Sequence, residues 1–325
     1  MDDVLDTGYH HPRTPVELWL ARQWEEVIGF AVGIRENFFE VGGNSLDAAR
    51  VINAVYEEFG VQLPLNVLTD HPTVERLAAR LRELNDRLPG PLVALQRGDG
   101  TRPPLFLVHP ANGQVGAYCH LAQALGEEFT VFGLQAAGLH SDAEPAGSVA
   151  AAARAYVDAV RSVAPEGPYH LGGCSTGAAI AHEMAAELAD AGAEVRLLAV
   201  IDPGLPVAVS EPGFADAGPE DDPTAVLADW KARGLVPPDE TTDFVTRARR
   251  VWQAGHDALR DWRPRPYRGP LDIVRGPNGG PTDWAAGSAH GPAGNPNGDP
   301  ADWAAGSVRE HTTADVAGVL RGLVG

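Results

Sequence analysis

A serine between two glycines is the strongest candidate for covalent chemistry in this 325-residue sequence. Gly173-Cys174-Ser175-Thr176-Gly177 fits the pattern G-x-S-x-G and stands between a strand-like run (YHLG) and a helix-like run (AAIAHEMAAEL). In that context the glycines permit a sharp, strained turn that exposes the serine hydroxyl above a sheet. Cys174 is chemically the better nucleophile, but a turn counted from it needs a glycine where Thr176 stands. We therefore predict that Ser175 is the nucleophile and that Cys174 lines the pocket wall.

A nucleophilic serine needs a base and an acidic group that orients the base, in the chain order Ser, Asp, His for this kind of turn. Asp202 ends the next strand-like run (LLAVIDPG), where a carboxylate points into the ligand crevice. Its alternative role is to cap the following loop. His311, the last of 11 histidines, is the candidate base. Two alternatives stay open: VREHTT is simply the last strand with His311 on its surface, or His290 is the base.

An oxyanion hole requires two backbone N–H groups aimed at the developing charge. The residue after the nucleophile, Thr176, supplies one. The loop after an early strand (HPANG, 109–113) is the source of the other, with Ala111 as the predicted donor. His109 precedes Ser175, so chain order argues against it as the base, and we predict that it makes structural hydrogen bonds.

A second serine stands at a predicted helix start. In Gly42-Gly43-Asn44-Ser45-Leu46 the flanking glycines expose Ser45. Taken alone, a serine at this place is most often an N-cap, whose side chain accepts a hydrogen bond from the first turn of the helix. The surrounding sequence, given below, favours a different role.

The elements that position these residues fall into two groups. Residues 1–85 predict a small all-helical bundle, which begins with the helix start Thr14-Pro15-Val16-Glu17 and ends with short helices at Leu65–Thr69 and Thr73–Leu84. Residues 86–103, rich in Pro and Gly, are predicted to be a linker.

Residues 104–325 alternate between strand-like and helix-like runs, which predicts a mostly parallel α/β sheet. An insertion at about 204–265, with two predicted helices, is placed to form a lid. Near the C-terminus PNGGPTDWAAGS (277–288) recurs as PNGDPADWAAGS (296–307), a tandem duplication of unknown purpose. The predicted strands are Leu105–His109, Phe129–Gln135, Tyr169–Gly172, Val195–Asp202 and Leu271–Arg275, and the predicted helices are 114–126, 148–163, 177–191, 223–233 and 240–262.

Composition excludes several function classes. A formal net charge of −19, from 25 basic and 44 acidic residues, repels nucleic acid and acidic membrane surfaces. Two cysteines are too few for a disulfide scaffold or a cysteine-built metal site, and we predict no metal. The sequence lacks a membrane-length apolar run and a secretory signal, so we expect a soluble cytoplasmic protein.

Two parts of the sequence resemble known families. NFFEVGGNSLDAARV, with FGVQLPLNVLTDHPTVERLAARL, resembles the phosphopantetheine-bearing region of peptidyl carrier proteins, and the paired glycines favour the peptidyl type over polyketide or fatty-acid carriers. Residues 104–202 resemble a type I thioesterase of non-ribosomal peptide synthetases. The resemblance implies a C-terminal didomain: a four-helix carrier bundle (1–85), a linker (86–103), and an α/β-hydrolase (104–325) with a helical lid.

The resemblance also implies roles for individual residues. Ser45 carries a covalent 4′-phosphopantetheine added by a separate transferase, and Ser175 accepts the peptidyl group from that arm. Asp202 and a C-terminal histidine, His311, complete a Ser-His-Asp triad, while Ala111 and Thr176 form the oxyanion hole. The peptide is then released by hydrolysis or macrocyclisation.

The implied partners are upstream condensation and adenylation domains, and the N-terminal DDVLDTGYHH resembles the tail of an adenylation domain. We therefore expect the chain to be a piece of a larger synthetase.

The sequence departs from the family pattern at two places. Cys174 stands where the family often has tryptophan. The family usually has Gly-Asp-His and a longer connection to the last helix, whereas Arg309-Glu310 precede His311 and the connection is several residues short. Either His311 is the base in a compressed loop or the segment is altered. The functional alternatives are a purely hydrolytic or proofreading thioesterase, and a carrier fused to a non-catalytic docking module.

Overall fold

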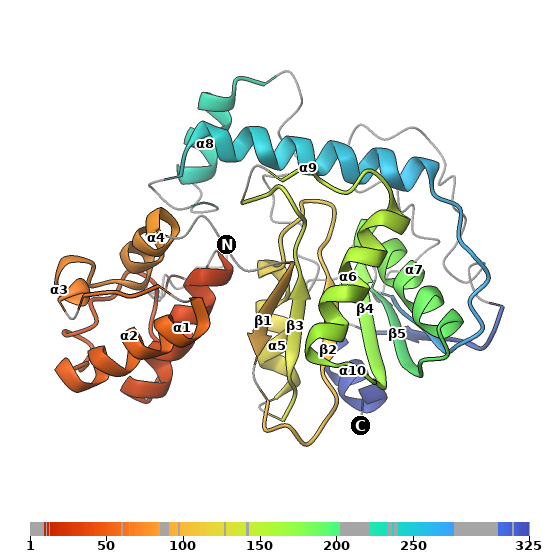
Figure 1. The fold of residues 1–325 in the computed structure, drawn as a ribbon, viewed down its shortest axis with the longest axis horizontal. Helices are drawn as coiled ribbons and strands as arrows, with labels where there is room; N and C mark the ends of the chain where they lie inside the picture. The colour runs from red at the N-terminus through yellow and green to blue at the C-terminus, as the bar shows by residue number, and fades with distance from the viewer. Residues whose placement is uncertain are drawn as a thin grey trace, which may run out of the picture. The chain divides into compact units, whose positions relative to one another are not determined.

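The structure, a computed structural model, describes two compact units, with the main division between Pro89 and Gly90. Each unit is treated by itself below (Figure 1). The residues that the structure describes are 10, 12, 14–59, 61–64, 66–84, 91–96, 98–126, 128–140, 143–201, 221–232, 236, 240–275, 305–313 and 315–324.

The first unit is the predicted helical bundle. Its helices are α1 (Pro15–Ile28), α2 (Ser45–Phe59), α3 (Val67–Asp70) and α4 (Val74–Leu84). The predicted start of α1 is confirmed: the Thr14 hydroxyl accepts from the Glu17 N–H at 3.2 Å, and the Glu17 carboxylate accepts from the Thr14 N–H at 3.2 Å. This reciprocal capping satisfies two N–H groups that the first turn cannot pair internally. Pro15 at the first helical position has no N–H to satisfy.

The core of this unit is built from one apolar stripe on each helix. Trp24 of α1 is fully buried and meets Phe38 of the α1–α2 loop edge to face, with ring centroids 4.8 Å apart. Burial of each such side chain stabilises the fold by about 1.5–3 kcal/mol relative to its exposed state. Phe38 thereby ties the loop that precedes α2 to the centre of the bundle. Other buried members of the core are Leu20, Ile34, Val55, Leu68, Leu77 and Leu81.

The second unit contains a seven-stranded sheet in the order β1-β3-β2-β4-β5-β6-β7. Every pairing is parallel except that of β1 with β3, so the prediction of a mostly parallel sheet is confirmed. The strands are β1 (Leu92–Gln96), β2 (Leu105–Val108), β3 (Val131–Leu134), β4 (Tyr169–Cys174), β5 (Val195–Ile201), β6 (Leu271–Arg275) and β7 (Val308–Thr312).

Strand β1 lies inside the segment that the sequence analysis assigns to the linker. Its apolar residues Val93 and Leu95 are buried, and it adds an antiparallel edge to β3. The run is short and bounded by Pro and Gly, which resembles a linker in sequence. Tertiary pairing, which no local pattern reports, makes it part of the sheet.

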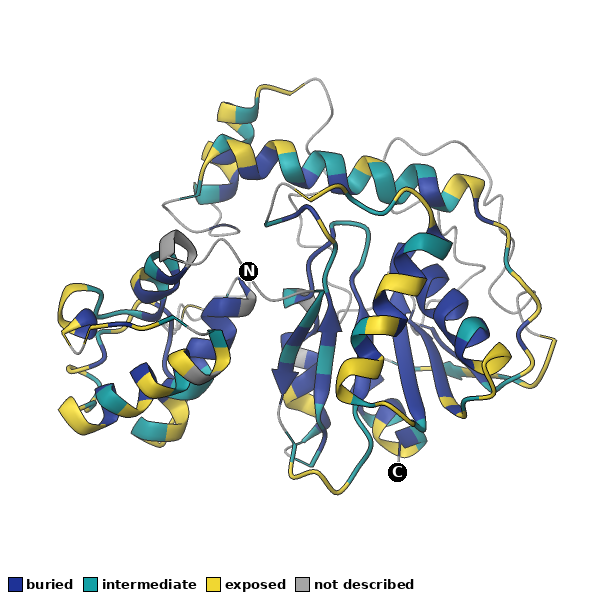
Figure 2. Cartoon of the chain, in the orientation of Figure 1, coloured by how far each residue is buried: buried dark blue, intermediate teal, exposed yellow. Residues whose placement is uncertain are grey.

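Helices cover both faces of the sheet. Figure 1 shows α6 (Val149–Val163) and α7 (Thr176–Asp190) in front of the strands, and α5 (Cys119–Leu125) and α10 (Val316–Val324) behind them. The strands β2, β4, β5 and β6 and the inward faces of α6 and α7 are mostly dark blue in Figure 2, because a core cluster lies between these layers. A short 3₁₀ turn, η1 (Gly116–Tyr118), precedes α5.

The expected insertion supplies two helices, α8 (Pro223–Ala232) and α9 (Thr242–Asp261). Helix α9 passes above the ends of the strands in Figure 1. Its C-terminal end is attached to α7, because the Glu183 carboxylate accepts from the Trp262 indole N–H at 3.2 Å and from Arg265 Nε at 2.8 Å. Within the described residues, the structure has no helix with the length and apolarity that a membrane crossing requires.

We predict that the capping box of α1 determines how firmly that helix begins. Thr14→Ala removes the side-chain acceptor and should cost about 1 kcal/mol, with faster amide hydrogen exchange confined to the first turn of α1. Ser148 caps α6 by accepting from the Ala151 N–H at 3.1 Å, so Ser148→Ala is the matched control in the other unit. It should accelerate exchange in α6 alone. Equal exchange in α1 of wild type and Thr14→Ala would contradict the prediction.

Candidate active site and carrier serine

Ser175 occupies the turn between the central strand β4 and helix α7. Its backbone has φ 53° and ψ −133°, and it is the one non-glycine residue with positive φ in the described part of the chain. An L residue adopts such angles at a cost of about 1–3 kcal/mol, and only where the surroundings force it. The predicted nucleophile elbow is therefore present in the backbone.

The two glycines of the motif allow this turn because there is no room for a side chain at either position. A Cβ on Gly173 would lie 2.6 Å from the backbone of Gly177. A Cβ on Gly177 would collide with the carbonyl oxygens of Val108 and His109 at the end of β2. Helix α7 thus begins directly against the loop that follows β2.

That close approach brings the two predicted oxyanion donors onto neighbouring segments. Thr176, 3% exposed, is the first residue of α7, where backbone N–H groups have no partner within the helix and the helix dipole favours negative charge. Ala111 lies in the turn after β2, which is closed by a 3.0 Å hydrogen bond from the Gly113 N–H to the Pro110 carbonyl. The arrangement has the two backbone segments that an oxyanion hole needs, and the donors themselves stay predictions.

Helix α9 covers both of these segments. The Val251 side chain lies 2.6 Å from the position that a Cβ on Gly113 would take. One turn later, a Cβ on Gly255 would be 3.7 Å from the Thr176 methyl group. The predicted lid helix therefore packs against both the β2 loop and the start of α7.

His109 has the structural role that chain order predicts. Burial lowers its pKa to about 4, so the ring is neutral at pH 7. A neutral ring that donates from Nδ1 to the Pro110 carbonyl at 2.7 Å has its Nε2 2.9 Å from the Tyr156 hydroxyl, which also donates to the Gln135 carbonyl at 3.1 Å. Both ring nitrogens are occupied, and neither is available to a nucleophile.

His311 lies on the edge strand β7 and is bound to a carboxylate. Its Nε2 donates to Asp272 Oδ1 at 2.8 Å, and Arg309 donates to both oxygens of Asp272 at 2.8 and 2.7 Å. Parallel pairing explains the cluster: Asp272 faces Arg309 and Val274 faces His311 in the register, so the three polar side chains share one face. Asp272 is fully buried, and a buried carboxylate requires such partners.

The structure does not bring His311 to Ser175. Cys174, Ile201, Val274 and His311 form one row across β4, β5, β6 and β7. At about 4.8 Å for each strand, the row separates the two backbones by roughly 14 Å. The observed placement agrees with the alternative in which VREHTT is the last strand and His311, with 26% of its side chain exposed, lies at its surface.

The remaining triad candidates are outside the described residues. Asp202 directly follows β5, and His290 belongs to the duplicated loop; neither position is described. Among the described side chains, the structure records no hydrogen bond partner for the Ser175 hydroxyl. Cys174 is 2% exposed beside the elbow, and its predicted place in a pocket wall stays a prediction.

The Asp272–Arg309 pair was not predicted from the sequence. Two signals point to it: one aspartate within an otherwise apolar strand (LDIVR), and Arg and His at alternate positions of the next strand (VREHT). Alternation in a strand puts those two side chains on one face. The partner strand, however, is known only from the fold.

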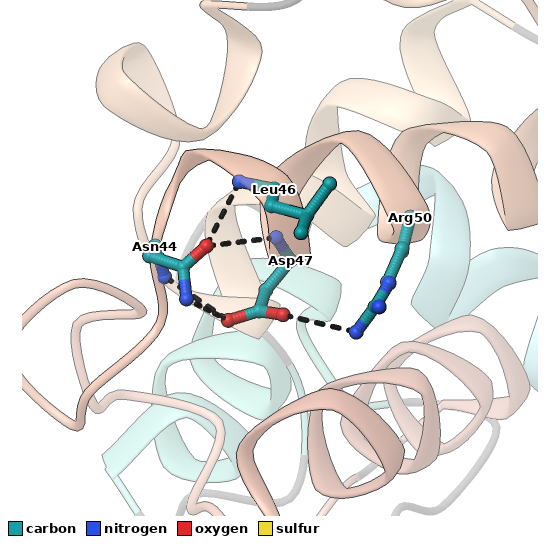
Figure 3. Close-up of polar contacts among 4 residues, drawn as sticks. All are labelled: Asn44, Leu46, Asp47 and Arg50. Atoms are coloured by element: carbon teal, nitrogen blue, oxygen red, sulfur yellow. Dashed lines mark hydrogen bonds and ion pairs between the residues drawn. The ribbon is translucent and has the colours of Figure 1, made fainter.

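In the helical unit, Asn44 and not Ser45 caps α2 (Figure 3). The Asn44 side-chain oxygen accepts from the Leu46 and Asp47 N–H groups at 2.9 and 3.2 Å, and the Asp47 carboxylate accepts from the Asn44 N–H at 3.4 Å. Asp47 is held in turn by Arg50 at 3.4 Å. The interpretation of Ser45 as an N-cap is therefore wrong.

Because Asn44 caps the helix, the Ser45 side chain is not needed for capping. Ser45 is the first residue of α2 and is exposed. Gly43 sets this position, because a Cβ there would lie 2.5 Å from the ring of the buried Phe38. An exposed hydroxyl in the first turn of a helix suits a phosphodiester, since the free N–H groups and the helix dipole attract anions. The following residue, Leu46, is 64% exposed and adds an apolar contact surface beside it.

These two serines define the class: a hydrolase-type unit with a strained nucleophile elbow, preceded by a helical carrier-type unit. The chain belongs to the thioesterase domain family, which it matches over residues 103–316. Residues 18–81 match the phosphopantetheine attachment site family, which indicates a covalently attached 4′-phosphopantetheine. The molecule is a carrier–thioesterase didomain.

Similar proteins are much longer. A dimodular nonribosomal peptide synthase of Bacillus subtilis (strain 168) is 38% identical over 192 residues, which is 59% of this chain and 8% of that protein. Malpinin synthetase of Mortierella alpina is 34% identical over 272 residues, 82% of this chain and 4% of that protein. The chain thus spans under a tenth of either relative.

Solved structures show the same fold. The four-domain nonribosomal peptide synthetase holo-AB3403, bound to AMP and glycine, matches 97% of this chain with 26% of its own, at a TM-score of 0.74 and 24% identity. The Vlm2 thioesterase domain with 2,3-diaminopropionic acid bound with a dodecadepsipeptide matches 72% of this chain with 98% of its own, at a TM-score of 0.54 and 23% identity.

The packing at Gly177 gives a direct test of the elbow. Gly177→Ala places a methyl group against two carbonyl oxygens and should destabilise the second unit by about 1–3 kcal/mol, measured by urea denaturation. Gly147→Ala is the control, because a Cβ at Gly147 meets no atom within 4 Å. Equal stability of the two variants would contradict the packing described here.

Proposed function

We propose that this chain releases a peptide from its own carrier unit, in the cytoplasm, at the end of a larger synthetase. The observation that carries the proposal is the strained Ser175 between β4 and α7, packed against the β2 loop. Ser45 is the proposed attachment residue of the phosphopantetheine, added by a separate transferase. That group supplies a thiol on which the peptide is held as a thioester.

The first step is acyl transfer. The Ser175 Oγ attacks the thioester carbonyl carbon and its proton passes to the base. The tetrahedral oxyanion accepts hydrogen bonds from the N–H groups of Thr176 and Ala111, which is worth about 2.7–4 kcal/mol for each donor removed in comparable sites. The C–S bond then breaks, the proton moves from the base to the departing thiol, and an ester on Ser175 remains.

The second step frees the peptide. Water, or a nucleophile within the peptide, loses a proton to the base and attacks the ester carbonyl. The C–O bond to Ser175 breaks and the serine recovers its proton. Water gives a linear acid, and an internal nucleophile gives a macrocycle. Helix α9 packs against both segments of the site, and we propose that it limits the access of water and so favours the internal nucleophile.

The base of the proposed triad is a histidine oriented by Asp202. His311 is the first candidate. To act as the base, its side chain would have to break the hydrogen bond to Asp272 and reach Ser175 across β6 and β5. His290 is the second. A second candidate function, a non-catalytic docking module, is favoured by one observation, the hydrogen bond that holds His311 to Asp272.

The proposal predicts that acyl groups pass from the carrier to Ser175. With an acyl-pantetheine mimic loaded on Ser45, intact mass should show an acyl adduct on Ser175 in wild type and none in Ser175→Ala. Lost adduct formation in His311→Ala assigns the base to His311, and the same loss in His290→Ala alone assigns it to His290; removal of a general base costs about 10²–10⁴-fold in rate. Absence of any adduct in wild type would support the docking module instead.

The carrier assignment has its own test. Ser45→Ala should abolish phosphopantetheine loading by a transferase and leave the helical unit as stable as wild type, since Asn44 does the capping. Asn44→Ala should keep the hydroxyl but loosen the first turn of α2, by about 1 kcal/mol, and slow loading. Mass spectrometry of the loaded chain and amide exchange of α2 measure the two effects. Loading that persists in Ser45→Ala would move the attachment to another residue.

A further inference from the structure

The hydroxyl group of Tyr118 lies between the two backbone segments that form the candidate site. Tyr118 ends the short turn η1 and its side chain is fully buried. Its hydroxyl donates to the Val108 carbonyl at 2.8 Å and accepts from the Cys174 N–H at 3.2 Å. One oxygen atom thus joins the last residue of β2 to the last residue of β4.

These two contacts stand immediately before the chemically important residues. Val108 leads into the loop of Ala111, and Cys174 is followed by Ser175. Val108 is also the register partner of Gly173, the residue before Cys174. The phenol therefore continues the pairing of β2 and β4 at the point where the two strands separate into the loop and the elbow.

The elbow needs support of this kind. A residue with φ 53° returns to a lower-energy conformation unless its neighbours hold it. The Gly177 contact prevents movement of α7 toward β2, but a steric contact does not prevent the segments from moving apart. The Tyr118 hydroxyl resists that separation, because it is hydrogen-bonded to Val108 on one segment and to Cys174 on the other.

We propose that Tyr118 is a positioning residue that fixes the distance between the Ser175 hydroxyl and the oxyanion donor of the β2 loop. The inference rests on the proposed function of Ser175. Tyr118 itself touches no reacting atom. Burial and the nearby Cys174 raise the pKa of its hydroxyl well above the usual value, so the group keeps the proton that it donates to Val108.

Tyr118→Phe removes both hydrogen bonds and keeps the ring. The matched control is Tyr169→Phe at the opposite end of β4. Tyr169 is 1% exposed, and its hydroxyl lies 2.8 and 3.0 Å from the carbonyl oxygens of Ala164 and Pro165. Both variants lose a buried hydroxyl group that is hydrogen-bonded to the backbone. Only the Tyr118 hydroxyl connects the end of β2 to the end of β4, the two segments that form the candidate site.

The readout is the rate of Ser175 acylation by an acyl-N-acetylcysteamine thioester, with the full chain, and the KM and kcat of release. Tyr118→Phe should acylate about 10- to 100-fold more slowly with KM within about twofold of wild type, because misplacement of an oxyanion donor weakens transition-state contacts rather than binding. Tyr169→Phe should lose a similar amount of thermal stability and keep the wild-type rate.

Each outcome bears on one idea. Equal rates in the two Phe variants, with wild type acylated, would overturn the role of Tyr118 alone. No Ser175 adduct in wild type would overturn the proposed function and this role with it. If Tyr118→Phe does not fold, the variant Tyr118→4-aminophenylalanine takes its place, because its amino group retains a donor to the Val108 carbonyl. Its rate of Ser175 acylation should be at least about a tenth of the wild-type rate. An acylation rate lower than about a hundredth of wild type in that folded variant would contradict the inference.

Discussion

The contact between the start of α7 and the end of β2 is the constraint on which the catalytic unit depends. Gly177 has no side chain, so α7 begins against the carbonyl oxygens of Val108 and His109, and the chain must turn through Ser175 with a positive φ to reach that place. The same contact puts the free N–H groups of α7 beside the β2 loop. Strain at one residue therefore places a half-buried serine beside backbone N–H groups that have no partner within the helix.

Much of this was predictable because the signals are local. G-x-S-x-G between a strand and a helix specifies the elbow, and Thr-Pro-x-Glu specifies the start of α1. Strand β1 was missed because its pairing with β3 is non-local. In sequence, its five residues cannot be distinguished from a linker that happens to contain apolar residues. The sequence does not say which residue caps α2 for a different reason: Asn44 and Ser45 are both good caps, and only the hydrogen bonds distinguish them.

The position of His311 follows from a competition for one side chain. Asp272 is fully buried in β6, and its carboxylate accepts hydrogen bonds from both Arg309 and His311. Chain order predicts a catalytic histidine near the C-terminus but says nothing about a buried carboxylate on the neighbouring strand. Breaking the His311 bond gives up one hydrogen bond to a charged group, a loss of about 1.5–3 kcal/mol, so the fold itself opposes the release of His311 toward Ser175.

The two serines are positioned by different physical means, and the difference suits the chemistry proposed for each. Ser175 is held by strain and close packing, which a nucleophile needs because its attack geometry must be accurate. Ser45 lies in an ordinary first helical turn that is capped by Asn44 together with Asp47, so its hydroxyl is not needed to cap the helix. An attachment point for a flexible arm needs exposure rather than rigid aim. Under the proposed function, this difference between a strained serine and an exposed, unstrained one is the physical basis for separating acyl transport from acyl transfer within one chain.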